Sequence, residues 1–258
     1  MIKVLVVGCK GKVGSSMYEL LRGVDDFQVW GIDINGQESG KADKVDIMHI
    51  CYGCKDEQDF VETTINYMKQ FDPTLTIINS TVIPNVTDKI FQETDKLITH
   101  SPVRGMYPNM KHDLLHYVKF IGAVNNKASE LAKQHFERLG MNTYVCESPK
   151  ETEFAKLFAT SYYALLIAWF QEMHRICKEH SVNYSQVVEF IKTEEDKPIL
   201  HAGYIGGECL IPNIHLLFKK TFSKFLQAVL ESNERWKPAE VEKQVRGTIR
   251  KDRWRFIS

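Results

Sequence analysis

The stretch VLVVGCKGKVGSSMYELL, residues 4–21, decides the fold that the sequence predicts. A β-branched run comes first, three glycines follow, and the rest has the spacing of a helix. Gly8 permits a sharp turn, Gly11 lets the backbone approach a ligand, and Gly14 lets the helix pack closely on the strand. The pattern is typical of a turn that holds the pyrophosphate of a dinucleotide at a helix N-terminus. A tight turn without a ligand is the alternative interpretation.

An acidic residue supports the dinucleotide interpretation. Asp33 lies near the end of the next predicted strand, residues 27–34, where a carboxylate accepts hydrogen bonds from the adenosine ribose. The same charge repels a 2′-phosphate, and no Lys or Arg follows Asp33 until Lys41, so the sequence favours NAD over NADP. The predicted cofactor-binding residues are Gly8, Gly11, Lys12, Val13, Gly14, Asp33, Ile34, Cys51, Ser80 and Thr81.

Strand and helix patterns alternate through the first half of the chain. This alternation predicts an α/β fold of the Rossmann type, a doubly wound and mainly parallel sheet with helices on both faces. We expect an NAD-binding domain over residues 1–148 and an all-helical substrate and dimerisation domain over residues 149–258. Strands are expected at 2–7, 27–34, 44–51, 75–80, 97–100, 119–123 and 142–146, and helices near 15–22, 59–71, 86–94, 127–139, 150–181, 182–192, 214–232 and 238–250.

One long helix organises the predicted second domain. Residues 150–181 contain no Gly or Pro, and apolar residues recur there close to the helical period. The middle of this segment, YYALLIAWF (residues 162–170), is apolar on every side, and such a helix must be surrounded by other protein. We therefore expect it to form a core between domains or between two subunits, and we predict a homodimer.

Composition sets limits on the function. The chain has 33 Lys and Arg against 33 Asp and Glu, so a broad electrostatic attraction to nucleic acid or to an anionic membrane is not expected. No apolar run reaches the length of a membrane span, and the start resembles a strand rather than a signal peptide. Six scattered cysteines then indicate free thiols in the reducing cytoplasm. The basic and aromatic tail, residues 243–256, is interpreted as a solvated face or a strap on a partner subunit in preference to a phosphate-binding segment.

Four later segments resemble the UDP-glucose/GDP-mannose dehydrogenase family, within the larger 6-phosphogluconate-dehydrogenase-like group. They are VDIMHICYG (45–53), INSTVIPNVT (78–87), the long-helix stretch from ETEFAK to HSVN (151–183) and GYIGGECLIPN (203–213). The resemblance covers roughly residues 1–218, and the long helix and the GGEC turn are its most specific parts. HSPVRG, residues 100–105, is similar to the substrate-binding turn of the sister family of β-hydroxyacid dehydrogenases.

The resemblance implies roles for individual residues. Cys209 would be a nucleophile that captures an aldehyde as a thiohemiacetal, which is oxidised to a thioester and hydrolysed. Lys156 would polarise the reacting oxygen, and Thr81 and Asn213 would position water or substrate. A buried structural Cys and a surface Lys are the alternatives for the first two. The predicted substrate-binding residues are Arg104, Tyr107, Thr160, Gly206 and Gly207.

Three positions depart from the family pattern. The family Asn is Thr160 here, the family acid after the Cys is Asn213, and the Glu of a Ser-Pro-Glu segment is Val103. None of these replacements acts as a base near neutral pH, which weakens the hydrolytic half of a double oxidation. The family's third domain, which holds the nucleotide of the substrate, is also expected to be absent, so the chain resembles a short form of the family.

The sequence therefore predicts an NAD-dependent dehydrogenase that oxidises an alcohol of a sugar or a nucleotide-sugar-like substrate. One alternative is a single-hydride dehydrogenase or reductase of the β-hydroxyacid type that uses Lys156 and Arg104. The other is a non-catalytic NAD-binding protein derived from a dehydrogenase. The pair Cys51 and Cys54 lacks a second pair of ligands, so no metal site is predicted.

Overall fold

The computed structural model describes residues 1–33, 36–37, 44–105 and 108–237. The chain divides into two compact units, Met1–Leu157 and a second that starts at Phe158. A helix begins at Pro149, next to the domain boundary predicted at residues 148–149, but the division into units falls further along that helix, after Leu157. The domain boundary at 148–149 therefore stays a proposal. Ile34, Tyr107, the helix predicted over 238–250 and the basic tail lie outside the described residues.

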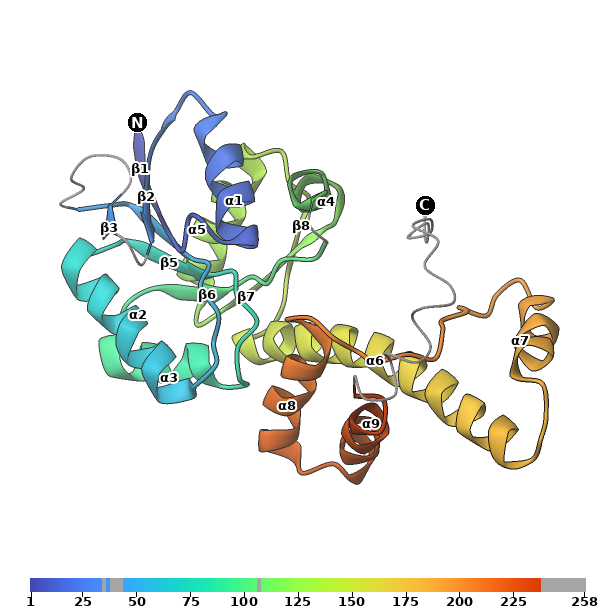
Figure 1. Cartoon of the computed structure of the whole chain (residues 1–258). Coiled ribbons are helices and arrows are strands. Elements are labelled where there is room, and N and C mark those ends of the chain that lie inside the picture. The colour runs from blue at the N-terminus through green and yellow to red at the C-terminus, as the bar shows by residue number, and fades with distance from the viewer. Residues whose placement is uncertain (34–35, 38–43, 106–107, 238–258) are drawn as a thin grey trace. The chain divides into compact units, whose positions relative to one another are not determined.

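In the described part of the first unit, eight strands form one sheet in the order β3-β2-β1-β4-β5-β6-β7-β8 (Figure 1). Neighbouring strands are parallel except β3 against β2 and β7 against β6. The predicted mainly parallel α/β fold is thus confirmed. The strands are β1 (Ile2–Val7), β2 (Phe27–Asp33), β3 (Gly36–Gln37), β4 (Ile47–Ile50), β5 (Leu75–Ile78), β6 (Ile98–His100), β7 (Lys119–Ala123) and β8 (Thr143–Val145).

Helices cover both faces of this sheet (Figure 1). α1 (Lys12–Arg22), α4 (Met110–His116) and α5 (Asn126–Arg138) share one apolar core with Val4 and Val6 of β1. Leu5 and Val7 point the opposite way and are equally buried, on the side of α2 (Glu57–Phe71) and α3 (Val86–Thr94). Burial on both faces explains why β1 is a continuous apolar run instead of an alternating one.

The second unit is helical in its described part. α6 (Pro149–Glu179) enters it from the first unit, and α7 (Tyr184–Lys192), α8 (Leu210–Thr221) and α9 (Lys224–Glu234) follow. Buried amides connect these helices to the loop before α8. Gln171 donates to the carbonyl of Gly203 at 2.6 Å, and Asn233 accepts from the N–H of Ile205 at 2.7 Å. These bonds hold the segment that leads into the predicted Gly206–Cys209 turn.

One predicted helix is wrong. The segment 214–232, expected to be continuous, is divided between α8 and α9. Phe222 ends α8 in the left-handed region, with φ of 49°, and its N–H donates to the carbonyl of Phe218 at 2.9 Å. Asn and Gly are the usual residues at such a position, so a Phe there gave no signal in the sequence. The strand β3 and the helix α4 were also not predicted.

Candidate active site

The glycine turn packs β1 and α1 closely together. Gly8 has φ of +86° and donates its N–H to the carbonyl of Ile32 at 2.7 Å. A Cβ on Gly14 would stand 1.9 Å from the carbonyl oxygen of Gly8, so only glycine allows α1 to lie this close to the turn. A Cβ on Gly11 would meet nothing nearer than that same oxygen at 3.4 Å. The fold itself therefore requires Gly8 and Gly14, while the space beside Gly11 is open.

The predicted cofactor residues that the structure describes converge on one edge of the sheet. Gly8 follows β1, Asp33 ends β2, Cys51 follows β4, and Ser80 and Thr81 follow β5, while Lys12 and Val13 open α1. This is the carboxyl edge of the parallel strands, next to the point between β1 and β4 where the strand order reverses, and ligands of such folds bind there.

Two polar contacts shape this edge. Asp33 accepts a hydrogen bond from the N–H of Lys10 through Oδ2 at 2.8 Å, which fixes its carboxylate against the glycine turn. Ser80 donates its hydroxyl to the carbonyl of Tyr52 at 2.5 Å, which ties the end of β5 to the segment after β4. The two contacts thus join the ends of neighbouring strands, β1 to β2 and β4 to β5.

Lys156 lies half-buried on α6, within the first unit. Its Nζ donates to the carbonyl of Val103 at 2.8 Å. Lys156 is thus half-buried with a fixed backbone partner, and its role stays a prediction. Val103, where the family has a Glu, has a buried side chain, so its contribution to Lys156 comes from the backbone. Thr81 is half-buried at the end of β5.

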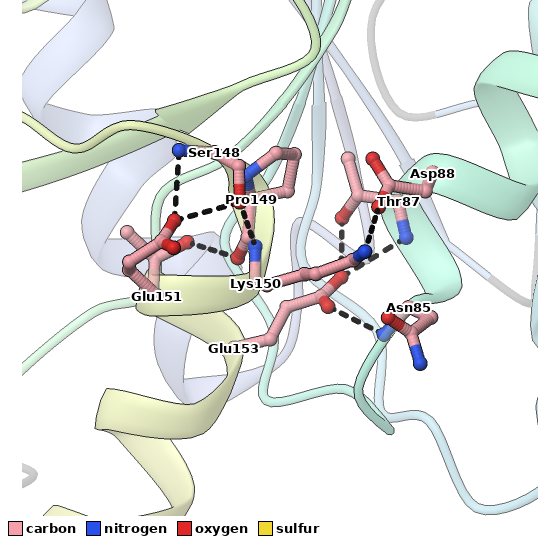
Figure 2. Close-up of polar contacts among 9 residues, drawn as sticks. Asn85, Thr87, Asp88, Ser148, Pro149, Lys150, Glu151 and Glu153 are labelled. Atoms are coloured by element: carbon pink, nitrogen blue, oxygen red, sulfur yellow. Dashed lines mark hydrogen bonds and ion pairs between the residues drawn. The ribbon is translucent and has the colours of Figure 1, made fainter.

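Glu153, one turn before Lys156, was missed by the sequence analysis. It is fully buried and points from α6 to the N-terminus of α3 (Figure 2). Its carboxylate accepts from the N–H of Asn85 at 2.6 Å, the N–H of Thr87 at 3.0 Å and the hydroxyl of Thr87 at 2.7 Å. Burial raises the pKa of Glu153 to about 6, although these hydrogen bonds oppose the rise. This contact fixes α6 against the segment that follows Thr81.

Arg104 is exposed, but its guanidinium makes several contacts. Its Nη2 donates to the carbonyl of Val118 at 2.7 Å, and its guanidinium lies 5.1 Å from the ring centres of both Tyr117 and Phe120. Stacking on two aromatic rings holds the guanidinium in one orientation. The guanidinium is thus held by a backbone carbonyl and two aromatic rings.

A buried polar cluster lies under the same edge of the sheet. Asn79 donates through Nδ2 to Nδ1 of His49 at 3.0 Å, and Nε2 of His49 lies 2.8 Å from Nε2 of His135. With this amide orientation, His49 carries its proton on Nε2 and donates it to His135. Burial lowers the pKa of His49 well below its ordinary value and that of His135 to about 3, so both rings are neutral.

The cluster also contains a cation. The ammonium of Lys119 donates to the side-chain oxygen of Asn79 at 3.3 Å. Lys119 and His49 were predicted only as parts of strands. For His49, the ionisable ring inside the apolar run IMHI (47–50) was the available signal.

The remaining predicted site residues belong to the second unit. Cys209 is exposed at the N-cap of α8, where unpaired backbone N–H groups and the positive end of the helix dipole favour an anion. Gly207 before it has φ of +88°, and Gly206 is exposed. Asn213 is buried one turn after Cys209 and donates through Nδ2 to the hydroxyl oxygen of Thr160 at 3.2 Å. Thr160 and Asn213, two of the three residues that differ from the family pattern, are thus in contact.

The pair Cys51 and Cys54 shows no sign of reactivity. Both thiols are free, and burial raises the pKa of Cys51 to about 12 and that of Cys54 to about 11. Over the residues that the structure describes, no three His, Cys, Asp or Glu side chains are grouped so as to hold a metal ion. In that same part of the chain, every helix is too short or too polar to cross a bilayer.

Comparisons of sequence and of structure both find nucleotide-sugar dehydrogenases among the proteins that are similar to this chain. Residues 150–235 match the model described as UDP-glucose/GDP-mannose dehydrogenase family, central domain. The UDP-N-acetyl-D-mannosamine dehydrogenase of Methanococcus vannielii is 26% identical over 211 residues, which cover 76% of this chain and 49% of that protein. The chain thus spans about half the length of the curated relatives that it matches.

Two solved structures show how widely this fold is shared. The UDP-D-ManNAc dehydrogenase of Pyrococcus horikoshii superposes with a TM-score of 0.82 at 19% identity, covering 95% of this chain and 71% of that one. The 3-hydroxyisobutyrate dehydrogenase of Mycobacterium tuberculosis superposes with a TM-score of 0.68 at 11% identity, covering 94% of both chains. Together the comparisons confirm the predicted resemblance to the UDP-glucose/GDP-mannose dehydrogenase family, whose central-domain model matches residues 150–235.

Proposed function

We propose that this chain acts as an NAD-dependent dehydrogenase that oxidises an alcohol of a sugar or a nucleotide-sugar-like substrate. The observation that carries the proposal is the turn from Gly8 to Gly14, with the carboxylate of Asp33 held against it. The open space at Gly11, next to the N-terminus of α1, suits a pyrophosphate, and Asp33 suits the ribose of NAD. The names of the relatives suggest UDP-N-acetyl-D-mannosamine as the first substrate to test.

The chain's own groups would then orient and polarise the substrate. NAD, when bound, would accept the hydride from the carbinol carbon. Lys156, held by the carbonyl of Val103, would donate a hydrogen bond to the reacting oxygen and stabilise its developing negative charge. Thr81, at the carboxyl end of β5, would position the substrate, and the stacked guanidinium of Arg104 would bind an anionic group on it.

Cys209 is proposed as a nucleophile for a second oxidation. Its sulfur would form a bond to the aldehyde carbon while the carbonyl oxygen takes up a proton, which gives a thiohemiacetal. Loss of a hydride from that adduct to a second NAD, and of its hydroxyl proton to solvent, would give a thioester, and water would then displace the Cys209 thiol and release the acid. The exposure of Cys209 and its place at the N-cap of α8 support this role. Asn213, one turn further on, would orient the water.

The proposal is tested by incubating the purified chain with NAD and UDP-N-acetyl-D-mannosamine and following NADH absorbance. Two NADH per substrate, with an acid as the product, would support the double oxidation. Cys209→Ser should then stop at the aldehyde with one NADH, while Cys146→Ser, at a thiol outside the proposed site, should behave like the unmodified protein. Turnover to the acid by Cys209→Ser would contradict the covalent step. No binding of NAD would contradict the whole proposal.

A second candidate is a single-hydride dehydrogenase of the β-hydroxyacid type. Two observations favour it. The 3-hydroxyisobutyrate dehydrogenase structure matches this chain over nearly its full length. The contact between Thr160 and Asn213 also joins two neutral groups where hydrolysis of a thioester would benefit from a base. This candidate predicts one NADH per hydroxyacid and unchanged turnover in Cys209→Ser. A non-catalytic NAD-binding protein would show NAD binding without turnover of either substrate class.

We propose in addition that the protein works as a homodimer. Phe158, Tyr162, Trp169 and Ile176 recur at intervals of four and seven residues, so they form one stripe on α6, and each is at least 40% exposed. Phe158 and Tyr162 also line a hollow of about 400 Å³, which a large side chain of a second copy would fill. Light scattering should give the mass of a dimer, and Trp169→Glu should give a monomer.

The free state of all six cysteines supports the predicted reducing cytoplasm. If the protein is kept in a reducing compartment, mass spectrometry of material purified under alkylating conditions should find six alkylated thiols.

A further inference from the structure

Lys119 is a buried cation at the carboxyl edge of the sheet. It opens β7, which runs antiparallel to β6, and its side chain is almost entirely buried, with 3% of the residue exposed. The ammonium donates to the carbonyl of Ser101 at 2.6 Å, the carbonyl of Pro102 at 3.4 Å and Oδ1 of Asn79 at 3.3 Å. All three acceptors are neutral, and the ring of Phe136 lies 5.1 Å from Nζ.

The side chain of Asn79 is itself held in one orientation. Its Nδ2 donates to Nδ1 of His49 and to the carbonyl of Ile77, which leaves Oδ1 to face Lys119. A backbone bond joins the same residue to the next segment, since the N–H of Val103 donates to the carbonyl of Asn79 at 3.3 Å. Asn79 is therefore held by contacts other than its bond to Lys119.

An unpaired buried charge is costly, so the arrangement needs a reason. Burial lowers the pKa of Lys119 to about 7, the thiol of Cys51 opposes this, and the nearby positive charges of Lys156 and Arg104 add to it. His49, His135 and His100 also face the ammonium, and its charge lowers the pKa of each.

The contacts of Lys119 continue directly into those of Lys156. Lys119 binds the carbonyls of Ser101 and Pro102, and Lys156 binds the next carbonyl, that of Val103. Arg104 closes the segment by donating to the carbonyl of Val118, the residue before Lys119. Three consecutive carbonyls are thus held by two ammonium groups, one from β7 and one from α6.

We propose that Lys119 is a positioning residue for Lys156. By holding the carbonyls of Ser101 and Pro102, it fixes the backbone so that the carbonyl of Val103 points at Nζ of Lys156 and keeps that group in place. The effect on turnover rests on the proposed function, in which Lys156 binds the reacting oxygen. The effect on the position of Lys156 does not depend on the proposed function, and it can be measured without any substrate.

The test compares the acetylation rate of Lys156 by dilute acetic anhydride, read by mass spectrometry, in the full chain. Lys119→Met should release the Val103 carbonyl and raise the rate about threefold to tenfold, the range that corresponds to one lost hydrogen bond. Lys119→Arg, which keeps the charge and the donors, should restore the slow rate. The control Lys89→Met removes a half-buried Lys of α3 that is paired with Glu57 of α2, and it should change nothing.

The direction of the change separates positioning from simple electrostatics. Removing a positive charge near Lys156 favours its unreactive ammonium form, so an electrostatic link alone would slow acetylation. In an active protein, Lys119→Met should also lower kcat about tenfold or more while KM for NAD stays within about twofold. A general loss of structure would instead weaken NAD binding and lower the melting temperature.

Several outcomes would overturn the inference. Unchanged or slower acetylation of Lys156 in folded Lys119→Met would do so, whether or not the protein proves to be a dehydrogenase. If that variant does not fold, Lys119→Gln, whose amide can still reach towards Asn79, takes its place with the same expectation. Failure of both variants to fold would assign Lys119 to the stability of the core and reject a positioning role.

Discussion

Replacing Gly14 and Gly11 one at a time should separate the two tasks of the glycine turn. A Cβ on Gly14 would lie 1.9 Å from the carbonyl oxygen of Gly8, whereas ordinary contact begins at 3.4 Å. In Gly14→Ala the helix must therefore move away from the turn by more than about 1 Å. Overpacking of this kind costs about 3 kcal/mol, which lowers the melting temperature by about 6–12 °C in a chain of this size.

Gly11→Ser should instead keep the stability of the protein and weaken the binding of NAD. Gly11 is the N-cap of α1 with φ of −71° and ψ of 164°, a conformation that Ser adopts readily and in which its hydroxyl caps the helix. Its Cβ would touch only the carbonyl oxygen of Gly8, at 3.4 Å. The free energy of unfolding should then change by less than about 0.5 kcal/mol. The new side chain would fill the space proposed for the pyrophosphate, and NAD affinity should fall at least about tenfold.

Thermal unfolding without ligand and calorimetric titration with NAD measure the two effects independently. Gly14→Ala should lose melting temperature, and Gly11→Ser should lose only affinity. If Gly11→Ser binds NAD as tightly as the unmodified chain, the pyrophosphate does not lie at this turn. If Gly14→Ala melts at the original temperature, the close packing of α1 on the turn does not contribute as described.

Three further predictions follow from buried and edge groups. Glu153→Ala should lower the free energy of unfolding by about 3–5 kcal/mol in urea titrations, because two N–H groups at the start of α3 lose their acceptor, and Glu153→Gln should cost less. His100 and His135 have pKa values lowered to about 3 from 6.5, so the unfolded chain binds more protons below pH 6.5. Each of these two histidines should therefore lower the free energy of unfolding by about 2 kcal/mol when the pH falls from 7 to 5. His135→Phe should make that fall smaller, as measured by urea unfolding at pH 7 and pH 5. Asp33→Asn keeps an acceptor for the N–H of Lys10 but loses the charge, so the ratio of NADP to NAD affinity should rise about tenfold in binding titrations; an unchanged ratio would reject Asp33 as the ribose ligand.

Much of the first unit could be predicted because its signals are local. The β-branched run of β1 is buried on both faces, and the helix α3 begins and ends at the predicted residues, 86–94. The spacing of Gly8, Gly11 and Gly14 likewise reports on contacts within one short turn. In such cases the residues that determine the structure are neighbours in sequence, so periodicity and glycine positions suffice.

The polar interior could not be predicted for the opposite reason. Lys119 is buried because Asn79 and Ser101, far away in sequence, supply its acceptors. Glu153 is buried because the N-terminus of α3 lies against it. Composition and periodicity do not predict partners that are far apart in the sequence. A lysine at the start of a strand therefore resembles a solvent-facing one until the fold is known.

The hydrogen bond between Thr160 and Asn213 constrains how this chain and its relatives can be interconverted. Asn213 is buried and its amide donates to the Thr160 hydroxyl, so the effect of a substitution at one position depends on the residue at the other. The two sites should be inherited, and engineered, as a unit.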